Sequence, residues 1–297
     1  MKFTALFLGI SLIVFFWGEI KGAVAPGPGN NKKEKSMGKG NSLPESPGIR
    51  IVKRWEMPEL LTEISGVSYV DADRFACVQD ELGTIFIYNT KTSTIEKEIP
   101  FGDIGDYEGI AMVNEVAWVI RADGRLFEVN NINTGKPEVK EYATHLTIKQ
   151  NVEAVGYDKN NNRLLLTIKD GEPGNKEYKG IYSFDLVIRK MPAQPVFKID
   201  LQHEVFSNGN NSKKKNEEFM PTAIALHPVS REIYITDGPS GKLLVMDAEG
   251  NIKKLYQLNK NEFSQPEGIT INPDGEIFIA NEGKKDPGAI LKIEIAE

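Results

Sequence analysis

The sequence predicts an all-β fold, a five-bladed β-propeller closed by an N-terminal strand that completes the last blade. Two observations support it: one short phrase recurs five times along the chain, and each copy opens a series of strand-like segments. Beyond Trp17 the chain has no long apolar periodicity of the helical kind, which disfavours an α/β enzyme fold. Repeats of this type bury their apolar faces against their neighbours and build one continuous domain.

The recurring phrase sets the number of blades. Its copies begin at Glu63, Asp106, Asn151, Met220 and Gln265, at intervals of 43, 45, 69 and 45 residues. A four-stranded propeller blade takes roughly 40 to 45 residues. The long interval contains two polar insertions, near residues 171–179 and 207–218, so we expect longer loops in the third blade.

The segments after each phrase read as the remaining strands of a blade. A turn rich in Asn, Asp, Gly or Pro comes first, and then a second and a third strand. Fourth strands, such as residues 94–100 and 251–257, follow in the first four blades, but the chain ends too early to supply a fifth. The alternating segment 50–56 has no blade of its own. We expect it to pair with the last blade, which would remove two exposed sheet edges.

The N-terminal residues lie outside this repeat. Residues 1–23 have a basic start, a short apolar run and small residues near Ala23, as in a secretory signal peptide, with an uncleaved membrane anchor as the alternative. Residues 24–48, rich in Pro, Gly and Lys, predict a disordered linker, and residues 49–297 the propeller. We therefore expect a protein exported to the periplasm or cell envelope, either free or tethered to the membrane through its N-terminus.

Charge, cysteine and histidine content narrow the function classes. Residues 1–50 carry seven Lys or Arg and three Glu, so a net charge of −10 falls on the rest of a chain whose total is −6. An acidic domain argues against a nucleic acid as partner and is compatible with cations. Cys77 is the only cysteine, which excludes an intramolecular disulfide. The three histidines, His145, His203 and His227, are expected on outer strands or loops, where they favour neither a zinc site nor a catalytic triad. We expect a monomer.

The phrase also predicts a site on the propeller axis. The first strand of each blade lines the channel, so equivalent residues of the five phrases converge at one end of it. One such position holds Ser65, Glu108, Glu153, Thr222 and Glu267. Carboxylates brought this close repel one another and raise one another's pKa, and a hard cation such as Ca²⁺ removes the conflict by accepting oxygen ligands. Alternatively, these glutamates accept backbone amides between blades and hold the ring together without metal.

Neighbouring positions extend this candidate site. Two residues upstream of each site residue stand Glu63, Asp106, Asn151, Met220 and Gln265, which offer further oxygens. The ends of the second strands are expected to form a mixed polar rim, with Asp80, Glu81, Arg121, Lys169, Asp170, Asp237, Asn281 and Glu282. From these sets, Glu63, Asp80 and Glu81 are taken as additional metal ligands.

The phrases resemble those of a known family. Residues 63–69, 79–86, 105–111 and 265–269 look like the SdiA-regulated family of bacterial envelope proteins, and the resemblance covers roughly residues 52–296. It implies an NHL-like, five-bladed propeller with a Ca²⁺ site and no established catalysis. On matching positions it supports Glu108, Glu153 and Glu267, and also Asp80 and Glu81. The fourth copy departs from the pattern at Met220 and Thr222, so a complete acidic ring is not expected.

Two function classes remain open. The first is a binding or scaffold protein of the envelope, in which Ca²⁺ stabilises the channel and another face meets an unidentified protein or small molecule. The alternative is a metal-dependent hydrolase, lactonase or phosphoesterase-like, which uses an axial Ca²⁺ to activate water with Glu81 or Asp237 as general base. A phosphate site would require clustered cations, and only Arg121 and Lys169 are offered. The sequence therefore favours a binding protein, with no residue assigned to catalysis.

Overall fold

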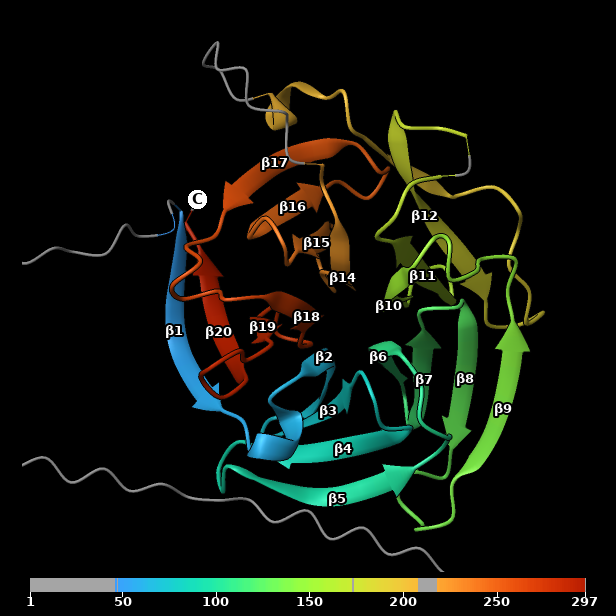
Figure 1. The fold of residues 1–297 in the computed structure, drawn as a ribbon, viewed down its shortest axis with the longest axis vertical. Coiled ribbons are helices and arrows are strands. Elements are labelled where there is room, and N and C mark those ends of the chain that lie inside the picture. The colour runs from blue at the N-terminus through green and yellow to red at the C-terminus, as the bar shows by residue number, and fades with distance from the viewer. Residues whose placement is uncertain (1–45, 47, 173, 208–217, 297) are drawn as a thin grey trace, which may run out of the picture. The chain divides into compact units, whose positions relative to one another are not determined.

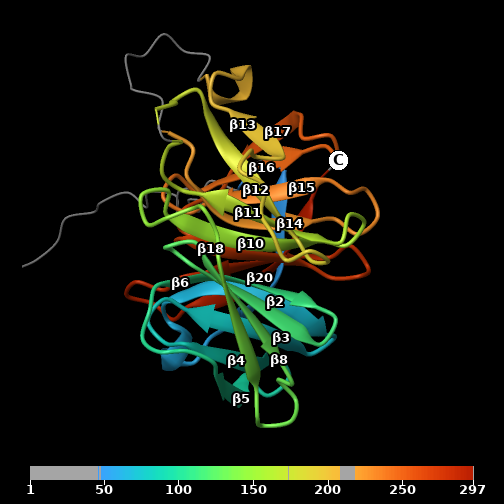
Figure 2. The same cartoon turned by 90° about the vertical axis from the view of Figure 1, so that its right-hand side faces the viewer.

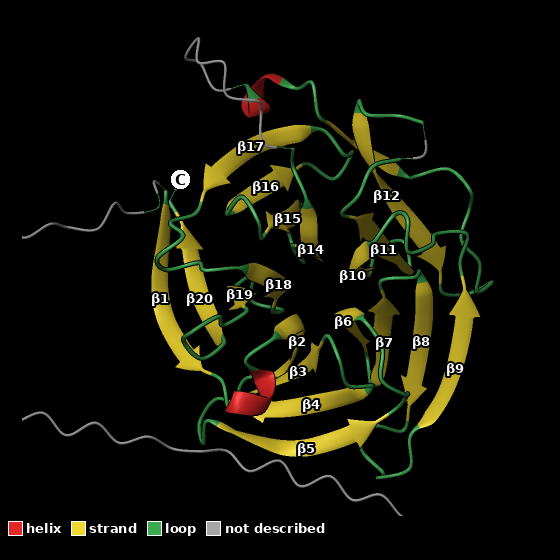
Figure 3. Ribbon diagram, viewed as in Figure 1, coloured by secondary structure: helices red, strands yellow, loops and turns green. Residues whose placement is uncertain are grey.

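The computed structural model describes residues 46, 48–172, 174–207 and 218–296. Within these residues it contains twenty strands and two short 3-10 helices, η1 (Glu59–Leu61) and η2 (Glu204–Phe206). The strands form five antiparallel sheets of four strands each, arranged around a common axis (Figure 1). Figure 3 shows how little of this structure is helical. The prediction of an all-β, five-bladed propeller is confirmed.

Each blade is a meander that runs from the axis outward. Blade 1 consists of β2 (Ile64–Asp71), β3 (Arg74–Gln79), β4 (Thr84–Asn89) and β5 (Thr94–Pro100). Blade 2 consists of β6 (Tyr107–Val113), β7 (Val116–Arg121), β8 (Arg125–Asn130) and β9 (Glu138–Ala143). Blade 3 consists of β10 (Val152–Asp158), β11 (Arg163–Ile168), β12 (Tyr178–Asp185) and β13 (Phe197–Asp200). Blade 4 consists of β14 (Pro221–Leu226), β15 (Ile233–Asp237), β16 (Lys242–Met246) and β17 (Ile252–Gln257).

Blade 5 is built from both ends of the described chain. Its inner three strands are β18 (Pro266–Ile271), β19 (Ile277–Asn281) and β20 (Ala289–Ile295), and its outermost strand is β1 (Ile49–Glu56). The β1 and β20 strands pair antiparallel along their full length and lie side by side in Figure 1. The Trp55 ring packs on Phe278 of blade 5, with centroids 6.2 Å apart. The predicted closure of the ring by segment 50–56 is confirmed.

The core consists of apolar side chains between adjacent blades. Five buried clusters each combine residues of two neighbouring sheets; one joins Val78 of blade 1 to Tyr107 of blade 2. Cys77 is fully buried in another cluster, and burial raises the pKa of its thiol. Cys77 is therefore a small core residue, without the exposed thiolate that reactivity requires.

The five inner strands lie so close together that little room is left for side chains between them. A Cβ atom added to Gly66 of β2 would lie 2.8 Å from Gly109 Cα of β6. One added to Gly156 of β10 would lie 2.6 Å from the Ile224 carbonyl oxygen of β14. Figure 2 shows the same blades from the side. Among the residues described, no helix is long and apolar enough to cross a membrane.

Removing β1 should destabilise the whole ring, because β20 then presents an unpaired edge and Phe278 loses its Trp55 contact. A chain that begins at Met57 is expected to melt about 10 °C lower than the full chain, the size expected when a few kcal/mol are lost from a domain of this length. It should also form oligomers on a sizing column. A chain that begins at Ser46, which keeps β1, should melt with the full chain. Equal melting temperatures for all three chains would contradict the closure.

Candidate functional site

A β-bulge interrupts every inner strand at the equivalent position. The pairing with the second strand skips one residue in each blade: Ser65, Glu108, Glu153, Thr222 and Glu267. A bulge leaves the extra residue out of the ladder and re-aims its side chain. The five site residues predicted from the sequence are therefore the five bulged residues. They stand at the beginning of the inner strands, at the end of the channel that we call the acidic mouth.

The two hydroxyl residues of the acidic mouth link neighbouring blades. Ser65 Oγ donates a hydrogen bond of 2.6 Å to the Tyr107 carbonyl oxygen of blade 2. Thr222 Oγ1 donates a hydrogen bond of 2.6 Å to the Pro266 carbonyl oxygen of blade 5 and accepts one of 3.1 Å from the Gly238 amide. Both hydroxyls thus satisfy backbone groups that the bulges leave unpaired. Whether either also ligates a metal remains a prediction.

Glu153 has a cationic partner inside the acidic mouth. Lys169 Nζ lies 3.1 Å from each carboxylate oxygen of Glu153, and the Glu153 side chain is only 2% exposed. Burial by itself would lower the pKa of Lys169, but the carboxylates of Glu153 and Glu267 outweigh it and the net shift is upward. Lys169 is therefore a permanent positive charge among the glutamates, in the place where the sequence predicted a metal ion.

One cation is not enough for the buried carboxyl groups of Glu153 and Glu267 and the half-buried one of Glu108. Burial, and next to it the Glu153 carboxylate, raise the pKa of Glu108. Burial also raises the pKa of Glu153 in spite of Lys169. Burial and the charge of Glu153 raise the pKa of Glu267 to about 8. The predicted electrostatic conflict between these three glutamates is present as a raised pKa at each of them.

Several buried polar atoms beside these carboxyl groups have no hydrogen-bond partner among the described residues. They are Glu267 Oε1, Asp80 Oδ1, Thr167 Oγ1 and both side-chain polar atoms of Asn281. Gly238 explains how Glu267 fits, because a Cβ atom there would lie 2.6 Å from Glu267 Oε1. Buried polar groups are almost always satisfied by protein, water or an ion, so we expect water or an ion beside these atoms.

An outer group of acids extends the negative charge toward solvent. Glu63 and Glu81 are exposed, whereas Asp80 is half-buried. Burial, followed by the charge of Glu63, raises the pKa of Asp80. Burial also raises the pKa of Glu282, and the charges of Asp80 and Glu63 add to the effect. These acids therefore share one electrostatic environment, although none of them forms a bond to the bulged glutamates.

Two residues expected on the polar rim have other partners. Asp237 is fully buried, and its two oxygens accept hydrogen bonds from the backbone amides of Ser240 (2.8 Å) and Met220 (3.2 Å). Arg121 forms an ion pair of 2.8 Å with Asp123 and lies over the Phe127 ring. Asp237 is therefore not free to act as a general base. Of the two predicted cations, Arg121 and Lys169, only Lys169 faces the carboxyl groups of the bulged glutamates.

The donor set partly suits a hard divalent cation. Carboxylate and amide oxygens of Glu267, Asp80 and Asn281 lack partners, and oxygens of this kind are what Ca²⁺ prefers. In the described part of the chain, however, no three His, Cys, Asp or Glu side chains are grouped closely enough to hold a metal ion. A cation would have to displace the Lys169 ammonium from Glu153 and draw the glutamates together.

The sequence prediction missed Lys169 as the centre of the site, and it missed the bulges. The small residue after each bulged residue was a usable signal: Gly66, Gly109, Ala154, Ala223 and Gly268. Glycine inside a strand marks a bulge or a close backbone approach. No local pattern reveals that Lys169 is the centre of the site, because its neighbour Lys179, which holds its backbone, comes from another strand. The buried Lys179 ammonium donates to the Lys169 carbonyl oxygen and pairs with Glu218 at 3.0 Å.

Comparison with known proteins agrees with this architecture. A family model described as SdiA-regulated matches residues 48–285. No curated protein matches the chain. A glutaminyl cyclase from Myxococcus xanthus is similar in structure, with a TM-score of 0.58 and 14% identity over 84% of this chain and 96% of the cyclase. A streptogramin B lyase gives a TM-score of 0.47 and 13% identity over 85% of this chain and 99% of the lyase. At these identities the likeness concerns the propeller fold alone.

Replacing Thr222 by valine should destabilise the ring. The substitution keeps the shape of the side chain but leaves the Pro266 carbonyl oxygen and the Gly238 amide without their buried partner. We expect the free energy of unfolding to fall by about 1 to 3 kcal/mol, measured by urea denaturation. Thr94→Val, on the exposed edge of β5, is the matched control and should be neutral. Equal stability of the Thr222 variant and the wild type would show that this bridge between blades 4 and 5 contributes nothing.

The buried carboxyl groups should make stability depend on pH. Between the ordinary pKa of a glutamate, about 4.3, and the value of about 8 at Glu267, the folded protein keeps a proton that the unfolded chain releases. The free energy of unfolding then falls as pH rises, by about 1.4 kcal/mol per pH unit for each such group, until pH passes the folded pKa.

The Glu267→Gln variant has no titratable group at this position, so the pH-dependent contribution of Glu267 to stability is lost. Urea denaturation in the presence of a chelator, between pH 5.5 and 7.5, should therefore show a shallower fall for this variant than for the wild type. Glu98→Gln, at an exposed position on β5, should retain the wild-type slope. Parallel slopes for Glu267→Gln and the wild type would refute the protonated state of Glu267.

Proposed function

Because this chain belongs to the SdiA-regulated family, whose model spans its residues 48–285, we propose that it is an exported cell-envelope propeller that acts by binding rather than by catalysis. Its acidic mouth takes up a hard divalent cation, with Ca²⁺ as the first candidate. Residues 1–45, on which the expectations of a signal peptide or membrane anchor and most of the linker fall, lie outside the described residues. Export is therefore part of the proposal.

The observation that supports cation binding most strongly is the unpartnered Glu267 Oε1. Glu267 is 7% exposed, lies with the buried Glu153 and the half-buried Glu108, and has one oxygen without a hydrogen-bond partner among the described residues. A divalent cation would replace the protons of Glu108 and Glu267 and the Lys169 ammonium at Glu153, and would use oxygens that are already largely desolvated. Asp80, with its own unpartnered oxygen, is the best placed of the outer acids to contribute.

The Lys169 ammonium allows this site to exchange between a bound metal ion and a metal-free, ion-paired state. Its ammonium neutralises Glu153 when no metal is bound, so metal binding must break the ion pair at 3.1 Å and expel both the ammonium and protons. A site in which a side chain competes with the ion binds weakly and responds to ion concentration. Such behaviour suits an extracellular Ca²⁺ level, since extracellular modules bind Ca²⁺ with dissociation constants of about 10⁻⁴ to 10⁻³ M.

The hydrolase alternative has less support from the side chains. Its suggested general base, Asp237, is occupied by two backbone amides, and Arg121 is paired with Asp123. Glu81 remains exposed, but of the two cations predicted for a phosphate site only Lys169 faces the carboxyl groups, and it is paired with Glu153. We therefore favour a binding role in which the ion stabilises the inner ends of the blades.

Calcium titration of chelator-treated full-length protein tests the proposal. We expect Ca²⁺ in the millimolar range to raise the melting temperature of the wild type, as any ligand of the folded state does. The double variant Glu153→Gln, Glu267→Gln should lose this response. Lys169→Met should strengthen Ca²⁺ binding at least tenfold by calorimetry, because it removes the competing ammonium.

The matched control is Glu98→Gln combined with Glu138→Gln, which removes two exposed carboxylates of β5 and β9 and should leave the response intact. Absence of Ca²⁺ binding by both the wild type and Lys169→Met would disprove the metal site. A response that survives in the double variant of Glu153 and Glu267 would place the ion elsewhere. Turnover of a lactone or phosphoester panel that the same double variant abolishes would establish the hydrolase instead.

A further inference from the structure

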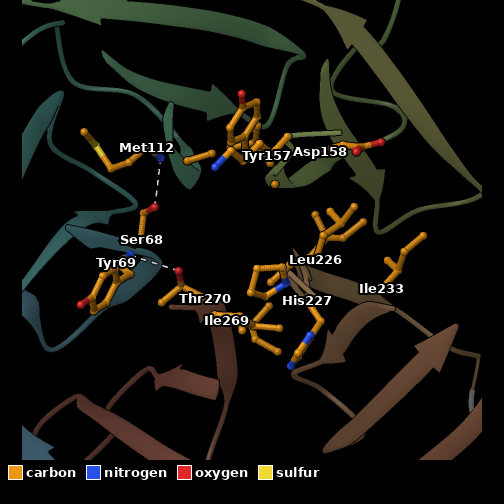
Figure 4. A pocket seen from close by; sticks show the side chains of 18 of the residues that line it. Ser68, Tyr69, Met112, Tyr157, Asp158, Leu226, His227, Ile233, Ile269 and Thr270 are labelled. Carbon is orange, nitrogen blue, oxygen red and sulfur yellow. Dashed lines mark hydrogen bonds between the residues drawn. The ribbon is translucent and has the colours of Figure 1, made fainter. Parts of the chain in front are cut away.

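The opposite end of the channel holds a pocket that the proposed metal site does not use. Its volume is about 500 Å³, and it is lined by residues near the ends of the inner strands β2, β6, β10, β14 and β18. Figure 4 shows labelled side chains from these strands around one space. Pockets that bind small organic ligands commonly have volumes of 300 to 1,000 Å³. We call this space the axial pocket.

The floor of the axial pocket is apolar and rigid. Each blade contributes one buried aliphatic residue, two positions beyond its bulged residue: Val67, Ile110, Val155, Ile224 and Ile269. Hydrogen bonds between blades hold the layer above. The Tyr69 amide donates to Thr270 Oγ1 at 3.0 Å, and the Met112 amide donates to Ser68 Oγ at 2.9 Å (Figure 4). These bonds satisfy the backbone close to the floor, so the floor offers apolar surface.

The walls are aromatic and aliphatic side chains that remain partly exposed. Tyr69, Met112, Tyr157, Leu226 and Ile271 all line the pocket, and all are half-buried. Five half-buried apolar side chains around one concavity form a surface that gains free energy when an apolar ligand removes water from it, by about 25 cal/mol for each Å². The Tyr69 ring itself packs on Phe75 and Phe278, with ring centroids 5.9 and 6.3 Å away, so it closes the wall between blades 1 and 5.

The rim carries uncompensated positive charge on one side. Lys159 of the β10–β11 turn and Arg231 of the β14–β15 turn both line the pocket, are exposed, and form no ion pair with another described residue. The carboxylate of the lining residue Asp158 is neutralised by Arg163 at 2.8 Å. Across the pocket, burial and the carboxylates of Asp71 and Asp274 raise the pKa of Tyr69, so that side is acidic. An anionic group is therefore favoured only beside blades 3 and 4.

We propose that the axial pocket binds a small amphipathic anion, a flat or branched apolar body that carries one carboxylate or sulfonate. The apolar body rests on the aliphatic floor, and the anionic head lies between Lys159 and Arg231. This assignment is independent of the acidic mouth, because the two sites occupy opposite ends of the inner strands.

Two dyes that share a ring system test the proposal on the full-length protein. The probe 1-anilinonaphthalene-8-sulfonate has the predicted anionic head, and N-phenyl-1-naphthylamine is its uncharged counterpart. We expect saturable binding of the sulfonate at one site per chain by fluorescence titration. Lys159→Gln combined with Arg231→Gln should weaken sulfonate binding at least tenfold and change binding of the neutral dye less than twofold. Leu226→Trp, which fills the pocket, should reduce binding of both dyes at least tenfold.

Lys140→Gln, on the exposed face of β9, is the matched charge control and should bind both dyes as the wild type does. The apolar run near the N-terminus is common to all variants, so it cannot account for differences between them. Melting curves of each variant confirm that the fold is retained. Sulfonate binding that is unaffected by the double variant would overturn the anionic head, and binding that survives Leu226→Trp would overturn the pocket itself.

Discussion

Five inner strands that converge on one axis run out of room for side chains, and this crowding shapes both ends of the channel. The narrowest layer carries glycine or alanine in every blade, because a Cβ atom at Gly66 would lie 2.8 Å from the Gly109 backbone. Directly before this layer each strand bulges. A bulge re-aims one side chain per blade, so the backbone geometry that relieves the crowding also assembles the acidic mouth.

The chemistry at that mouth follows from burial. Glu153 and Glu267 are almost inaccessible, and one ammonium group serves three carboxyl groups. In a low-dielectric ring the remaining charge must be cancelled by protons or by an ion. Under the function proposed above, the occupant of the ring depends on pH and on ion concentration. The hydroxyls of Ser65 and Thr222 bond to backbone carbonyl oxygens, which explains why a ring with only three acids can still hold all five blades in register.

Much of the fold could be predicted from the sequence because its signals are local and repeated. The turn residues and alternation placed residues 94–100 as a strand, and β5 has these bounds. The candidate residues followed from equivalence among the copies. The direction of each side chain could not be predicted, since it depends on contacts between blades. Lys169 was expected at the rim, but its backbone carbonyl oxygen accepts a hydrogen bond from Lys179, which in turn pairs with Glu218. The axial pocket was missed for the same reason, because its walls come from five separate strands.

The pairing of β1 with β20 joins residues about 240 positions apart in the sequence. During synthesis β1 is made before the other strands and β20 after them. The backbone hydrogen bonds of β1 to β20 therefore cannot form until β20 has been made. Contacts of such high sequence separation are slow to form. Blades 1 to 4 contain all their own strands, so only blade 5 depends on this late pairing. The clasp between β1 and β20 therefore acts as a latch, which closes the ring after the other four blades have been made.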